Sequence, residues 1–252
     1  MTIVEVMDTT LRDGEQTTGV SFSEVEKLTI ARLLLEDLKV NRIEVASARV
    51  SDGEFRAVKR ITDWARKHNC LDRVEILGFV DKTVSLDWIE EAGGKVINLL
   101  TKGSLKHLQG QLRKTPDEHL ADIQFVIEEA EKRGIQVNVY LEDWSNGMLS
   151  SRDYVFYMVD YLSKANIRRI MLPDTLGILN PDQAYDFCKE MVDRYPGVHF
   201  DFHAHNDYDF SVANVYMALK VGVKGIHTTI NGLGERAGNA PLASVLGMMN
   251  DH

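Results

Sequence analysis

The stretch Val198-His-Phe-Asp-Phe-His-Ala-His-Asn-Asp207 is an apolar run that closes in a cluster of polar side chains. Its pattern predicts a β-strand, with His203 and His205 two residues apart at the end of that strand. Side chains at i and i+2 of a strand point to the same face, so both imidazoles can converge on one point in space. The pair therefore indicates a metal site. Two partly buried structural histidines with carbonyl partners are the alternative.

Short apolar runs of the same kind alternate with longer amphipathic patterns along the whole chain. Polar residues followed by proline, at Thr115-Pro116 and Asn180-Pro181, are typical helix starts, and Ser23 with Glu26 forms a capping box. The apolar runs predict eight strands, at residues 3–7, 42–46, 74–79, 96–100, 137–141, 169–172, 199–202 and 225–230. The helical patterns lie at residues 24–38, 53–66, 86–91, 116–132, 152–164, 181–194, 211–221 and 241–249.

Strict alternation of strand and helix through eight strands predicts an α/β fold, a closed (β/α)8 TIM barrel that forms a single catalytic domain over residues 1–252. An open doubly wound sheet is the rival architecture. It is less favoured because no G-x-G-x-x-G follows the first strand, while a glycine-rich segment, 231–239, follows the last one. No linker, second domain or low-complexity segment is evident.

Composition limits the classes of function. The chain has a formal net charge of −9 and no basic stripe, which argues against nucleic-acid binding. Its two cysteines, Cys70 and Cys188, show no C-x-x-C spacing, so neither a disulfide framework nor a zinc ribbon is indicated. No apolar run is long enough for a membrane span, and charged residues occupy the place of a signal-peptide core. We expect a cytoplasmic protein without a membrane partner.

In a barrel of this kind the active site is built at the carboxyl ends of the strands. Polar side chains recur there, although loops are often polar for solubility alone. They are Asp8, Arg12 and Asp13 after the first strand, Ser47 after the second, Thr101 after the fourth, Glu142 and Asp143 after the fifth, Asp174 and Thr175 after the sixth, His203, His205 and Asn206 after the seventh, and residues 231–239 after the eighth. Two histidines and one carboxylate would hold a divalent cation and leave positions free for a substrate.

Four stretches of polar residues and glycines span nearly the whole chain. They are Asp8-Thr-Thr-Leu-Arg-Asp-Gly-Glu-Gln16, Leu172-Pro-Asp-Thr-Leu-Gly177, His203-Ala-His-Asn-Asp207 and Asn231-Gly-Leu-Gly-Glu-Arg-Ala-Gly-Asn239. Together, and in this order, they resemble the four signatures of the DRE-TIM metallolyase family. More narrowly, the chain resembles the acetyl-CoA-dependent Claisen condensing branch, which includes citramalate, 2-isopropylmalate and homocitrate synthases.

The resemblance implies a divalent metal, magnesium, manganese or zinc, held by Asp13, His203 and His205 with Asn239 as a further ligand or close neighbour. Such a metal acts as a Lewis acid on the carbonyl of a 2-oxo acid. Arg12 is implied to stabilise the developing negative charge. An ion pair of Arg12 with Asp8 or Asp13 that only orders the loop is the plainer alternative.

By the same resemblance, Glu142 takes part in removing a proton from the acetyl-CoA methyl group or orients the group that does so. Thr175 is implied to hydrogen-bond the carboxylate of the oxo acid. The alternatives are a solvated loop carboxylate for Glu142 and a helix-capping role for Thr175.

The resemblance also bears on which oxo acid is bound, because Leu77, Leu100 and Tyr140 match positions where citramalate synthases carry bulky apolar residues. These residues would shrink the pocket to fit pyruvate, giving citramalate. The alternative substrate is 2-oxoisovalerate, giving 2-isopropylmalate, for which smaller side chains are typical. Homocitrate synthesis is least favoured, since none of the three positions is basic. Leu77 and Leu100 could also simply fill barrel layers.

Family members usually continue into a helical subdomain with a catalytic histidine and often a regulatory domain, and both are expected to be absent from these 252 residues. The resemblance further predicts a homodimer. A lyase or aldolase of the same superfamily remains an alternative, although lyases for hydroxymethylglutaryl-CoA carry a catalytic cysteine in the loop after the last strand, where this chain has Glu235 and Arg236 and no cysteine. A non-haem iron oxygenase and a non-catalytic binding protein are the other classes considered.

Overall fold

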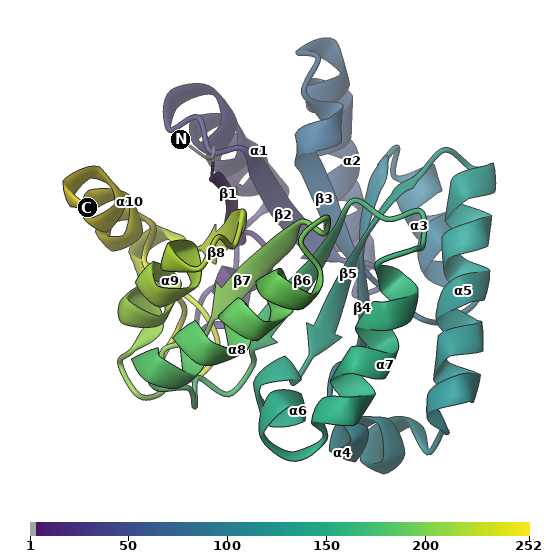
Figure 1. The fold of residues 1–252 in the computed structure, drawn as a ribbon. Coiled ribbons are helices and arrows are strands. Elements are labelled where there is room, and N and C mark those ends of the chain that lie inside the picture. Colours follow the sequence, from purple (N-terminus) through teal and green to yellow (C-terminus); the bar gives the residue numbers. More distant parts are fainter. Residues whose placement is uncertain (1–3) are drawn as a thin grey trace.

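A computed structural model describes residues 4–252 and shows a closed barrel of eight parallel strands (Figure 1). Each strand pairs with the next along the chain, and the first pairs with the last through Glu5 to Asp8 against Gly225 to Thr228. The predicted (β/α)8 barrel is therefore confirmed. The strands are β1 (Glu5–Asp8), β2 (Arg42–Ser47), β3 (Val74–Phe79), β4 (Val96–Lys102), β5 (Gln136–Glu142), β6 (Arg169–Asp174), β7 (Phe200–Ala204) and β8 (Gly225–Thr228).

The helices lie outside the strands and cover the barrel (Figure 1). Both proline helix starts and the Ser23–Glu26 capping box are present as expected. The α-helices are α1 (Glu24–Arg32), α2 (Asp52–Lys67), α3 (Val84–Glu91), α4 (Leu105–His107), α5 (Pro116–Lys132), α6 (Trp144–Ser150), α7 (Arg152–Leu162), α8 (Pro181–Arg194), α9 (Ser211–Lys220) and α10 (Leu242–Asp251). Five shorter elements complete the order, namely η1 (Gly14–Gln16), η2 (Leu33–Asp37), η3 (Leu71–Arg73), η4 (Leu108–Leu112) and η5 (Ile230–Gly232).

The sequence pattern placed every strand and missed some helical segments. The strand expected at 3–7 begins at Glu5, with residue 3 outside the described residues, and the one expected at 225–230 ends at Thr228. The helix expected at 24–38 changes to a π-helical turn from Leu33 to Asp37. The segments α4, η4 and α6 were not predicted. They are short helical turns in the loops after β4 and β5, without the long apolar periodicity that marks the outer helices.

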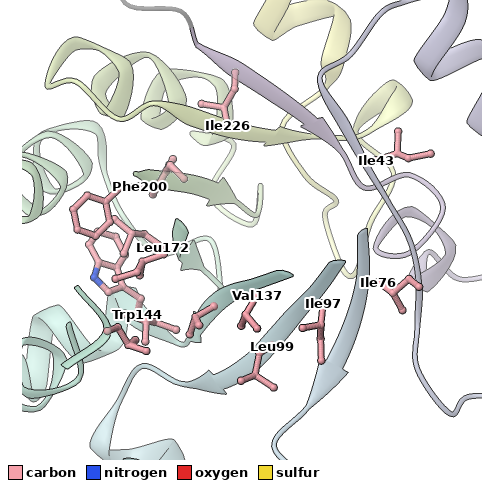
Figure 2. Close-up of a cluster of buried hydrophobic side chains, with 14 of the residues drawn as sticks. Ile43, Ile76, Ile97, Leu99, Val137, Trp144, Leu172, Phe200 and Ile226 are labelled. Carbon is pink, nitrogen blue, oxygen red and sulfur yellow. The ribbon is translucent and has the colours of Figure 1, made fainter. Parts of the chain in front are cut away.

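Apolar side chains fall into two separate clusters, one outside and one inside the barrel wall. The outer and larger one joins strands to the surrounding helices, and Figure 2 shows Ile97, Leu99, Val137, Leu172 and other members from several strands. The inner cluster holds Met7, Leu77, Tyr140 and Met171 with Leu100 packed against it. Adjacent strand residues alternate between the two sides, as the pleat requires. Among residues 4–252, no helix is long and apolar enough to cross a membrane.

Candidate active site

Three side chains of metal-ligand type meet at the carboxyl ends of the strands. Asp13 lies in the loop after β1, His203 belongs to β7, and His205 follows it directly. The Nε2 atoms of the two histidines are 3.2 Å apart, and Asp13 Oδ2 lies 3.1 Å from His203 Nε2 and 3.9 Å from His205 Nε2. One ligand atom of each residue lies within 4.8 Å of those of the others. The expected convergence of the two imidazoles is therefore observed.

The electrostatics of this cluster suit a bound cation. All three side chains are buried, and neither carboxylate oxygen of Asp13 has a hydrogen-bond partner among residues 4–252. Burial opposes the ionisation of Asp13, but Arg12, His203 and His205 together hold its pKa well below its ordinary value. Burial, with His203 alongside, lowers the pKa of His205 to about 3, so this imidazole is a neutral donor at neutral pH.

Asn239 reaches the same place from the loop after β8. It forms an isolated antiparallel bridge with His205, and its Nδ2 donates to the Leu233 carbonyl at 3.1 Å. That contact points the side-chain amide so that Oδ1 is buried without a partner in the described part of the chain. Its carbonyl oxygen is thus available beside His205.

Arg12 is held by a residue that the sequence analysis did not identify. Its Nε donates to Glu44 Oε2 at 2.5 Å, while Asp13 Oδ1 is 3.6 Å from its Nη1. Glu44 is fully buried on β2 and also accepts from Asn98 Nδ2 at 2.7 Å. The partner of Arg12 is therefore chiefly Glu44 rather than Asp8 or Asp13. A charged residue within the apolar strand pattern at 42–46 was the signal that could have revealed it.

Glu142 ends β5 and carries an ion pair to Lys102 at the end of β4. Lys102 Nζ also donates to Gln111 Oε1 at 2.6 Å. The side chain of Glu142 retains 23% of its exposure and lines the central cavity. It is therefore not a freely solvated loop carboxylate, and Lys102 is a second site residue missed from sequence.

Thr175 stands directly after β6, and its hydroxyl oxygen accepts the backbone N–H of Asp143 at 2.9 Å. Asp143 is the residue before α6, so Thr175 satisfies a backbone donor at that helix start. Because the oxygen accepts this bond, the hydroxyl hydrogen remains free to donate to a ligand in the cavity, which Thr175 lines.

Leu77, Leu100 and Tyr140 are brought together as neighbours in the inner cluster. All three line a cavity of about 230 Å³, together with the cationic and metal-ligand side chains described above. These residues therefore both fill the interior of the barrel and line the cavity. The other residues along the cavity wall are Gln16, Ser47, Phe79, Pro173 and Glu235.

Beneath His203 lies a buried histidine that the sequence analysis did not single out, His227 on β8. Its Nδ1 is 3.3 Å from His203 Nδ1 and 3.1 Å from the Tyr140 hydroxyl, and its Nε2 is 3.1 Å from Asp201 Oδ2. Burial lowers the pKa of His227 to about 4, although the adjacent Asp201 acts in the opposite direction. His227 is therefore neutral near pH 7.

The loop after β8 is tied to its neighbours by Arg236. Its guanidinium donates to both carboxylate oxygens of Asp207, at 2.7 and 2.9 Å, and to the Thr175 carbonyl at 2.8 Å. Three loops that carry candidate residues are thereby joined at the mouth of the barrel.

Comparison with known proteins supports the resemblance seen in the sequence. A family model described as HMGL-like matches residues 3–252. The chain is 34% identical over 245 residues to an (R)-citramalate synthase of Methanocaldococcus jannaschii, covering 97% of this chain and 48% of that one. It is 33% identical over 250 residues to a 2-isopropylmalate synthase of Sulfurisphaera tokodaii, covering 96% of this chain and 61% of that one. The chain thus spans about half to three fifths of these relatives.

The barrel is also similar to solved structures. The crystal structure of an HMG-CoA lyase from Bacillus subtilis superposes with a TM-score of 0.81 over 100% of this chain and 87% of the lyase, at 22% sequence identity. At that identity the likeness shows the fold alone.

Proposed function

Because this chain belongs to the HMGL-like family, the DRE-TIM group that its four motifs resemble, we propose that it is a metal-dependent synthase domain that condenses acetyl-CoA with a small 2-oxo acid. The favoured oxo acid is pyruvate, which would give citramalate. The observation that carries the proposal is the convergence of Asp13, His203 and His205 beside Arg12 in a cavity lined by both polar and apolar side chains.

The residues present fit a divalent cation. A buried carboxylate without hydrogen-bond partners, within reach of two imidazole nitrogens, is a costly arrangement for a protein unless a cation occupies it. In the proposal one carboxylate oxygen of Asp13 and one ring nitrogen each of His203 and His205 hold magnesium, manganese or zinc, and Asn239 Oδ1 is a fourth ligand atom or a close neighbour of the ion. Such an ion polarises the carbonyl group of an oxo acid.

The cavity wall offers a complementary set of contacts for the oxo acid itself. The Thr175 hydroxyl can donate to the substrate carboxylate while its oxygen keeps the Asp143 N–H. Arg12, held in place by Glu44, presents its remaining guanidinium hydrogens to the oxygen on which negative charge develops. The methyl group of pyruvate would face the inner apolar cluster.

Glu142 is proposed to act on the second substrate. As a base it would take a proton from the methyl group of the acetyl thioester, and the resulting carbon nucleophile would form a bond to the carbonyl carbon of the oxo acid. Hydrolysis of the thioester then releases coenzyme A. Lys102, paired with Glu142, holds this carboxylate in one orientation at the cavity edge.

A second oxo acid is the alternative substrate, because one of the relatives is named 2-isopropylmalate synthase. Its substrate in this proposal would be 2-oxoisovalerate, which is larger than pyruvate by two methyl groups. Leu77, Leu100 and Tyr140 pack together and line the cavity, and the space they fill would favour the smaller acid. A hydroxymethylglutaryl-CoA lyase reaction is disfavoured because the loop Asn231–Asn239 contains no cysteine.

Calorimetric titration of the manganese-loaded protein with pyruvate, and separately with 2-oxoisovalerate, tests the proposal. Each titration is repeated after chelation of the metal. Metal-dependent binding that favours pyruvate supports citramalate synthesis, and preference for 2-oxoisovalerate reassigns the substrate. If neither acid binds in the presence of metal, the proposed function is refuted.

A further inference from the structure

We infer that Asp201 and His227 are positioning residues that set the tautomer of His203, so that His203 Nε2 faces the metal position as an unprotonated donor. The inference deepens the proposed function and rests on it, because it concerns the same metal ligands. It assigns a role to a buried carboxylate and a buried histidine that do not line the cavity.

The three groups form a continuous line through the barrel interior. Asp201 and His203 lie two residues apart on β7, and His227 lies on the adjacent strand β8. Asp201 Oδ2 is 3.1 Å from His227 Nε2, and His227 Nδ1 is 3.3 Å from His203 Nδ1. All three side chains are at most 3% exposed, so water cannot readily substitute for a missing partner.

The ionised carboxylate of Asp201 determines which nitrogen of His227 carries the proton. Arg42 Nη2 donates to Asp201 Oδ2 at 2.6 Å, and His199 Nε2 lies 3.0 Å from Oδ1. An ionised carboxylate can only accept hydrogen bonds. The proton of neutral His227 must therefore sit on Nε2, where it is donated to Asp201.

The second proton follows from the first. A neutral imidazole with its proton on Nε2 has a lone pair on Nδ1. His203 can satisfy that lone pair only with a proton on its own Nδ1, which leaves its Nε2 unprotonated. This is the atom that lies 3.1 Å from Asp13 Oδ2 and 3.2 Å from His205 Nε2. Asp201 thus selects, through two rings, which nitrogen of His203 is available to a metal.

Tyr140 enters the same arrangement from the cavity side. Its hydroxyl is 3.1 Å from His227 Nδ1 and therefore competes with His203 for one acceptor. A tyrosine that donates there would weaken the restraint on His203. Replacing its hydroxyl in Tyr140→Phe should leave metal affinity equal to or higher than that of the wild type, since the acceptor then serves His203 alone.

A pair of variants separates this role from mere filling of space. In His227→Gln, the side-chain carbonyl can accept from His203 while the amide donates to Asp201, whereas His227→Phe keeps a ring of similar size but offers no acceptor. Manganese affinity is measured by the electron paramagnetic resonance signal of free Mn²⁺ at constant pH. We expect His227→Phe to bind manganese about 10- to 100-fold more weakly than wild type, and His227→Gln to stay within about threefold.

A second measurement needs no variant. Long-range ¹H–¹⁵N correlation spectra of the zinc-loaded wild-type protein should show His227 protonated on Nε2 and not on Nδ1. A proton on His227 Nδ1, or equal manganese affinity in folded His227→Phe and wild type, would overturn the inference while leaving the proposed function standing. Failure of the wild type to bind manganese would instead remove the metal site and both proposals with it.

Discussion

Arg12 Nε donates to Glu44 Oε2 at 2.5 Å, which ties the loop after β1 to the interior of β2. Thr9 Oγ1 and Asn98 Nδ2 donate to the same carboxylate, at 3.1 and 2.7 Å. The buried end of Glu44 thus joins β2, β4 and the loop after β1, and the orientation of the proposed charge-stabilising arginine depends on it.

Glu44→Ala should lower the free energy of unfolding by about 3 kcal/mol, because it leaves buried donors and a largely buried guanidinium without their acceptor. Urea denaturation measures the loss. The control is Glu24→Ala, which breaks an ion pair of the same 2.5 Å length to Arg56 on the surface and should cost less than about 1 kcal/mol. Equal effects of the two substitutions would contradict the importance assigned to burial.

Asp13→Asn and His205→Ala should each weaken manganese binding by more than about 100-fold. This loss is larger than the one expected for replacing a residue that only hydrogen-bonds to a metal ligand. Metal-dependent binding of pyruvate should be lost with it, while the circular dichroism spectrum stays that of the folded barrel. His68→Ala is the matched control, since it removes an exposed histidine at the end of α2. Unchanged pyruvate affinity in both site variants would refute the metal-bound substrate.

Leu100→Ala should raise the affinity for 2-oxoisovalerate relative to pyruvate by about 10-fold, because added pocket volume is worth roughly 1–3 kcal/mol for the larger acid. The neighbouring Leu99 points outward into the helix-facing core, so Leu99→Ala serves as the control. It should lower stability by about 2–5 kcal/mol and leave the ratio of the two affinities unchanged. Calorimetry with both acids gives the ratio, and the same ratio in Leu100→Ala as in wild type would exclude Leu100 from substrate selection.

We expect Asp8 to make the stability of the barrel depend on pH. Burial raises the pKa of its carboxyl to about 7 against an ordinary 3.8, although the side chain of Thr10 and the Thr10 N–H at 2.9 Å act in the opposite direction. A group whose folded pKa is raised stabilises the fold fully below its unfolded pKa and loses that contribution as pH rises through the folded value. The contribution of Asp8 should therefore decline between about pH 4 and 7, at up to about 1.4 kcal/mol per pH unit.

Asp8→Asn keeps an acceptor for Thr10 and removes the titration. The difference in unfolding free energy between the variant and the wild type should shift in favour of the variant as pH is raised from 5 to 8, with Asp153→Asn as an exposed control. Urea curves at each pH supply the comparison. A difference that is constant with pH would mean that Asp8 keeps an ordinary pKa.

The amino-acid sequence by itself determined the barrel and the neighbourhood of the site. Alternating apolar runs and helical patterns specify strands and helices locally, and eight such units close in one way, so the carboxyl ends of the strands gather Asp13, His203 and His205. Which buried side chains contact the site residues was decided by the tertiary structure alone. Glu44, Lys102 and His227 acquire their roles from strands that are distant in sequence, with Glu44 32 residues from Arg12 and His227 24 from His203. A periodic pattern reports which face a side chain occupies, whereas hydrogen bonds of about 3 Å depend on strand register and tilt, which only the closed barrel sets.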